Sequence, residues 1–161
     1  MNGQGVADKG FGELSGWAWW ARLGVYGAAT WGFAFAFVHL YWLFGGRVGL
    51  PDDLSLFDNL PLLIIDIVAV PLCVLAALVA LARVTRWGRR VPQQLLNIAI
   101  YGTAFVLLMH AFPSAVDWFA LAIGALSVDD LDSMERFATF LYEPFFFAGG
   151  LLFAVAASAR R

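Results

Sequence analysis

The chain contains four apolar stretches, each about as long as a helix that crosses a lipid bilayer. A hydrocarbon core about 30 Å thick is crossed by roughly 20 apolar residues in α-helical conformation. Hydrophobic residues make up 61% of the 161-residue sequence and charged residues only 14%. A chain of this composition has more apolar surface than one soluble domain can bury. The sequence therefore predicts an all-α, polytopic four-transmembrane-helix bundle in a single domain over residues 1–161, with spans at residues 22–44, 62–81, 95–119 and 137–157.

Basic and acidic residues are separated between the predicted loops. The link between the second and third spans carries four arginines and no acid: Arg83, Arg86, Arg89 and Arg90. The other two links are acidic. Because arginine and lysine are retained on the cytoplasmic side, we expect both termini inside (N-in/C-in), with residues 1–20 as a cytoplasmic lead-in. The segregated charges form no basic patch, so membrane lipids are expected partners and nucleic acid is not.

Each predicted span carries one ionisable side chain at a similar depth: His39, Asp66, His110 and Glu143. A rise of about 1.5 Å per residue places His39, Asp66 and Glu143 roughly 6 to 9 Å below the outer boundary, and His110, fifteen residues after Leu95, in about the same layer. Ionisable groups in a bilayer are costly and mark functional or packing sites. Small residues recur on the same helix faces, such as Gly32 below His39 and Ala77 beyond Asp66, and membrane helices meet at small residues. We therefore expect all four side chains to point inward and to line a polar cavity in the outer half of the bundle.

Three prolines remove backbone amide donors from the predicted spans: Pro71, Pro113 and Pro144. Each should leave the carbonyl four residues earlier without a donor. The carbonyls concerned are those of Ile67, Met109 and Phe140. A carbonyl freed at membrane depth must be met by a side chain, water or a ligand. The prolines therefore also indicate a polar outer half.

Several roles are open to the four ionisable residues. They could form a structural network of interhelical hydrogen bonds, or hold a divalent metal, because imidazole and carboxylate suit zinc, iron or manganese. His39 and His110 could bind a haem. The set could instead contact a lipophilic small molecule, or act on one as an intramembrane enzyme with Glu143 or Asp66 as general base and a histidine as acid partner. The sequence contains no Ser-His-Asp order, phosphate-binding loop or nucleotide fingerprint.

Two sequence elements carry a family resemblance. His39, Tyr41 and Trp42 are followed by Gly45, Gly46 and Gly49, and Leu141-Tyr142-Glu143-Pro144 precedes Gly149-Gly150. These elements resemble the His-x-Tyr-Trp-x-x-Gly-Gly-x-x-Gly and Leu-Tyr-x-Pro patterns of domain of unknown function 3995, a bacterial family of small membrane proteins. Glu143 stands where that family often has a small polar residue. The resemblance implies a four-helix protein of the bacterial plasma membrane and supplies no activity.

These observations together predict a small multi-pass membrane protein that binds a lipophilic ligand or a partner helix through the outer half of its bundle. The expected partners are membrane lipids and either a lipophilic small molecule or another membrane protein. An intramembrane acid–base enzyme and a metal- or haem-binding protein are the alternatives. The candidate ligand-binding residues are His39, Tyr41, Trp42, Asp66, His110, Tyr142 and Glu143.

Overall fold

The structure, a computed structural model, describes the backbone of residues 7–51 and 54–159 and the side chains from residue 19 onward. Within these ranges the chain is helical and contains no strand, which confirms the all-α prediction. The elements are α1 (Ala7–Leu43), α2 (Leu60–Ala82), η1 (Trp87–Arg90), α3 (Gln93–Ala122), η2 (Val128–Asp130), α4 (Ser133–Phe137), the π-helix η3 (Ala138–Tyr142) and α5 (Glu143–Ala157).

Four helical segments are long and apolar enough to cross a membrane: Trp19–Leu43, Leu60–Ala82, Gln93–Ala122 and Ser133–Ala157. The four predicted spans are thus confirmed, with ends that differ by a few residues. Helix α1 begins at Ala7, so most of the predicted lead-in is helical. At 37 residues, α1 is about 55 Å long, which exceeds the 40–45 Å of a bilayer with its headgroups.

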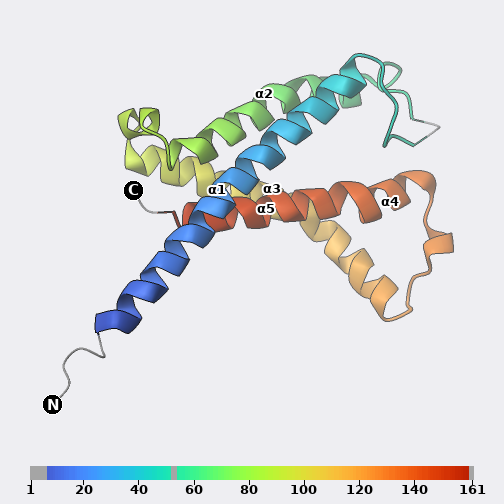
Figure 1. The fold of residues 1–161 in the computed structure, drawn as a ribbon. Coiled ribbons are helices and arrows are strands. Elements are labelled where there is room, and N and C mark those ends of the chain that lie inside the picture. Colours follow the sequence, from blue (N-terminus) through green and yellow to red (C-terminus); the bar gives the residue numbers. More distant parts are fainter. Residues whose placement is uncertain (1–6, 52–53, 160–161) are drawn as a thin grey trace.

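Helices α1 and α5 lie at the centre of the assembly, and α2 and α3 flank them (Figure 1). Helix α2 packs along the C-terminal half of α1, α5 crosses α1, and α3 packs against α5 (Figure 1). Contacts between α2 and α3 are few. One face of α3 is therefore covered by α5, and most of the rest of its surface is open to the surroundings.

Small residues allow the helices to approach closely where they cross. A methyl group at Gly32 would lie 2.9 Å from the Cys73 carbonyl oxygen of α2, and one at Gly150 would lie 2.6 Å from the Leu108 side chain of α3. A methyl group at Gly24 would similarly meet α5. Because side chains there would force the backbones apart, these glycines fix the helix spacing. The small-residue faces predicted for α1 and α2 are confirmed.

The last membrane span is built from two α-helices joined by the π-helix η3. The amide of Glu143 donates to the carbonyl of Ala138, five residues earlier. In this wider register the donor for the Thr139 carbonyl would be Pro144, which has no amide hydrogen. The indole Nε1 of Trp118 on α3 donates to that carbonyl instead, at 2.7 Å. The π-turn therefore moves the carbonyl that lacks its backbone donor from Phe140, as predicted, to Thr139.

Candidate functional site

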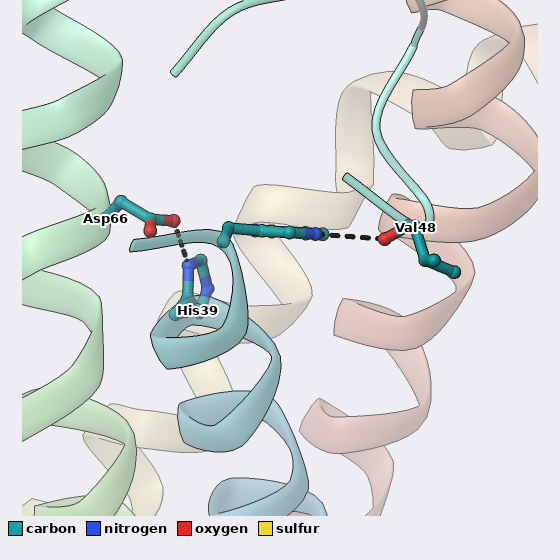
Figure 2. A network of polar contacts seen from close by, with 4 residues as sticks. His39, Val48 and Asp66 are labelled. Carbon is teal, nitrogen blue, oxygen red and sulfur yellow. Dashed lines mark hydrogen bonds and ion pairs between the residues drawn. The ribbon is translucent and has the colours of Figure 1, made fainter. Parts of the chain in front are cut away.

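His39 and Asp66 form a buried pair between α1 and α2. His39 Nδ1 and Asp66 Oδ1 are hydrogen-bonded, and both residues are only 2% exposed (Figure 2). The imidazole also packs against Phe35, with ring centroids 4.4 Å apart, and edge-on against Trp42. His39 Nε2 and Asp66 Oδ2 have no hydrogen-bond partner among the described residues. The prediction that these two residues point into the bundle is confirmed.

Tyr41 and Trp42 belong to the turn that ends α1. The amides of Gly45 and Gly46 donate to the carbonyls of Trp42 and Tyr41, both at 2.9 Å, and Gly45 has a φ of +89°. This is the Schellman pattern, in which a glycine in left-handed conformation closes the helix. A methyl group at Gly46 would overlap the Tyr41 ring, and the Trp42 indole donates to the Val48 carbonyl at 3.0 Å (Figure 2). The contacts of Tyr41 and Trp42 thus explain the first family element as a structural motif.

His110 and Glu143 form a second pair, between α3 and α5. His110 Nε2 lies 3.5 Å from Glu143 Oε1, and the two side chains are 48% and 12% exposed. The His110 ring packs on Phe146, with centroids 4.1 Å apart. Glu143 Oε2 is buried without a hydrogen-bond partner in the described part of the chain. The prediction that His110 points inward is wrong, because its side chain is half-exposed at the rim of the α3–α5 interface.

Tyr142 lies between the two histidine–carboxylate pairs. Its ring packs against Phe35, at a centroid distance of 5.8 Å, and against Phe146 at 4.9 Å. Its ring centroid also lies 6.2 Å from that of His110. Because Phe35 touches His39 and Phe146 touches His110, one aromatic layer joins the pairs. The four ionisable residues therefore lie near one level of the structure, as two pairs and not as one cluster.

The arrangement does not fit a single metal ion held by all four residues. No group of three or more His, Cys, Asp or Glu side chains within the described ranges is arranged to hold a metal. The two imidazoles belong to separate pairs: the ring of His39 packs against Phe35 and Trp42, and that of His110 packs against Phe146. The two pairs can exchange protons and form hydrogen bonds without a metal.

The four residues do not line the polar hollow found beside the loop that follows α3. A hollow of about 240 Å³ lies further along α3, next to the loop of residues 123–132. Its polar lining comes from Ser114, Asp117, Asp130, Glu135 and Thr139. Aromatic rings lie between the two pairs, and the hollow begins one helical turn beyond His110, at Ser114.

Arg83 is a structural residue that the sequence analysis assigned only to topology. It is 4% exposed, and its guanidinium donates to the Ala157 carbonyl at 2.6 Å and to Asn97 Oδ1 at 2.8 Å. A cation at the carbonyl end of α5 is also favoured by the helix dipole. The signal in the sequence was the position of Arg83, directly after the last apolar residue of a span.

One family model matches most of the chain. A family model described as "Protein of unknown function (DUF3995)" matches residues 32–153. The chain belongs to the DUF3995 family. The match begins in α1 and ends in α5, so the DUF3995 range includes both histidine–carboxylate pairs, the turn after α1 and the π-helix. No curated protein and no solved structure matches the chain.

Proposed function

We propose that this DUF3995 protein is a multi-pass protein of the bacterial plasma membrane that binds a lipophilic molecule at the His110–Glu143 pair. The observation that carries the proposal is the half-exposed imidazole of His110 on a membrane span. A polar group that faces lipid is costly unless it meets a partner. Glu143 adds a buried carboxylate oxygen with no partner among the described residues. The pair thus offers hydrogen-bonding capacity that a ligand in the bilayer can use.

The surroundings of the pair favour a long apolar molecule with one small polar group. Val106 and Pro113, four residues before and three residues after His110 on α3, are exposed and provide an apolar surface beside the imidazole. The imidazole can donate or accept a hydrogen bond, and the ionised carboxylate accepts. A hydroxyl group can pair with both at once. A lipophilic alcohol or phenol is therefore the ligand class that the pair fits best.

The test is to purify the protein from its own host in mild detergent and to record native mass spectra. We expect a discrete lipophilic mass in the wild type that is lost in His110→Ala and Glu143→Gln. Tyr101→Phe is the matched control, because it removes a hydroxyl from an exposed residue of the same helix. Retention of the mass in both pair variants would refute the proposal. If the wild type instead retains another protein chain, and both substitutions release it, the pair binds a partner helix and not a small molecule.

The proposed orientation places both termini in the cytoplasm. It is supported by the arginines of the 83–92 loop, of which Arg86, Arg89 and Arg90 are exposed, because exposed basic loops are retained on the cytoplasmic side. A green fluorescent protein fused at the C-terminus should fluoresce, and alkaline phosphatase fused there should be inactive. The same reporters inserted at Gly124 should behave in the opposite way. The reverse pattern would overturn the orientation.

A further inference from the structure

Two residues that line the hollow beside the 123–132 loop carry hydroxyl groups and are themselves almost fully buried. Ser114 on α3 and Thr139 in η3 are 8% and 2% exposed, and both line the hollow. Neither hydroxyl forms a hydrogen bond to any residue that the structure describes. Hydroxyls in helices commonly bond to the carbonyl four residues earlier, as Thr103 does to Ala99 at 2.8 Å. Neither hydroxyl oxygen is fully enclosed by protein atoms, and both residues line the hollow, so both hydroxyls are open to a ligand there.

Three carboxylates surround these hydroxyls. Asp130 and Glu135 each use one oxygen to cap a helix, accepting from the amides of Ser127 at 3.0 Å and Asp132 at 2.8 Å. Asp117 is partly buried and forms no hydrogen bond or ion pair within the described ranges. One cation lies nearby, because the guanidinium of the exposed Arg136 donates to the carbonyl of Leu131, which lines the hollow. The lining is therefore rich in acceptors and negative overall.

The shape of the site favours an organic cation over a bare metal ion. The three acids are not arranged as a metal-binding group, and about 240 Å³ of space far exceeds the roughly 30 Å³ of one water molecule. A primary ammonium group has three hydrogen-bond donors and one positive charge. It can therefore pair with the Asp117 carboxylate and with both hydroxyls.

The depth of the hollow matches that of lipid headgroups. Helix α3 has 30 residues and is about 45 Å long, which is the thickness of a bilayer with its headgroup layers. Asp117 lies five residues before its last residue, Ala122, or about 7 Å from that end. This is the level at which headgroups meet the hydrocarbon core.

We propose that the hollow binds the primary ammonium group of a lipid headgroup, as in phosphatidylethanolamine. Asp117 is the main carboxylate partner, Ser114 and Thr139 accept the remaining ammonium hydrogens, and Arg136 faces the phosphate. The site is distinct from the His110–Glu143 pair, although Ser114 follows His110 by one helical turn and Thr139 precedes Glu143 by one turn. Either site can bind its ligand without the other.

The test uses the full-length protein, delipidated in mild detergent and titrated with lipids of identical acyl chains in native mass spectrometry. We expect phosphatidylethanolamine to bind about tenfold more tightly than phosphatidylcholine, whose quaternary ammonium has no N–H donor, a ratio that one charge-assisted hydrogen bond supplies. Asp117→Asn should abolish this preference. Asp129→Asn is the matched control, because it removes the same charge from the adjoining loop, outside the hollow, and it should retain the preference.

Equal affinity for the two lipids, or an unchanged preference in Asp117→Asn, would overturn the proposal. Ser114→Ala, which leaves the carboxylates in place, should reduce the preference severalfold and provides the test if Asp117→Asn does not fold. Free ethanolamine that binds as tightly as the lipid would overturn the assignment to a lipid headgroup. His110→Ala should retain the lipid preference, so failure here and failure of the function proposed above are distinguishable.

Discussion

The buried His39–Asp66 pair allows a quantitative test of how strongly α1 and α2 are joined. We consider His39→Leu, Asp66→Val and the double variant that carries both changes. Each single substitution leaves the remaining polar side chain at 2% exposure with no partner on the opposite helix. His39 Nε2 and Asp66 Oδ2 already lack partners within the described residues. The side chain that remains in each single variant therefore has no other hydrogen bond.

The expected magnitude follows from this burial. A hydrogen bond between membrane helices contributes about 0.6 kcal/mol on average and about 1.7 kcal/mol at most. Removing one partner of a buried pair costs about 3 to 5 kcal/mol, because the other is left buried and unpaired. We expect each single variant to lose about 3 kcal/mol of unfolding free energy, and the double variant to lose less than the sum by about 2 kcal/mol. That coupling corresponds to about a 30-fold change in the folding equilibrium.

The assay is reversible unfolding by sodium dodecyl sulfate in bicelles, followed by tryptophan fluorescence. Thr103→Ala is the control, because its hydroxyl bonds within its own helix, and it should change the unfolding free energy by no more than about 0.5 kcal/mol. A coupling energy below about 0.6 kcal/mol would refute the reasoning. The pair would then contribute no more than an average interhelical hydrogen bond.

Two further substitutions test the packing around the last span. Gly149→Ala should lower the unfolding free energy by about 1 to 3 kcal/mol, because the added methyl group overlaps the Trp31 indole and the contact cannot relax freely. Gly102→Ala is the control: an added methyl group there has no atom within 4 Å and should be neutral or stabilising. Equal stability of the two variants would contradict this reasoning. Trp118→Phe should cost about 1 to 3 kcal/mol in the same assay, because the Thr139 carbonyl loses its indole donor, and an unchanged unfolding midpoint would show that another donor replaces it.

The spans were predictable because they depend on hydropathy averaged along the chain. The buried pair was predictable because small residues recur in helical register with His39 and Asp66. Hydropathy over about 20 residues identifies a span whatever its neighbours are. The small residues in register with His39 and Asp66 identified the faces that meet, since α1 and α2 pack along those faces. For this pair the pattern within each helix was sufficient.

The position of His110 was not predictable from the same kind of pattern. Ala99 and Thr103 share its face, and a small-residue face indicates where a helix can pack but not whether another helix is there. On α5 the stripe from Glu143 succeeds in part: Gly150 packs against Leu108 of α3, whereas Ala154 is exposed. The arrangement of helices around α3 depends on the whole fold, so the facing of one side chain required the structure.

Tyr41, Trp42 and Arg83 show a second limit of the sequence. Aromatic and basic residues at span ends are usually attributed to the interface with lipid headgroups. Here Tyr41 and Trp42 instead bond within the turn after α1, and Arg83 caps α5. Each contact joins residues whose relation depends on loop geometry, which hydropathy and spacing do not encode.

The π-helix gives the last span a rotational offset. An α-helix turns by about 100° per residue, so one additional residue in a turn rotates everything that follows by that angle. Glu143 faces His110, and Gly149 faces Trp31, with this offset in place. Deleting one residue between Ala138 and Tyr142 would leave hydropathy and length nearly unchanged but would turn both residues away from their partners. These two contacts therefore depend on the number of residues between Ala138 and Tyr142, which composition alone does not constrain.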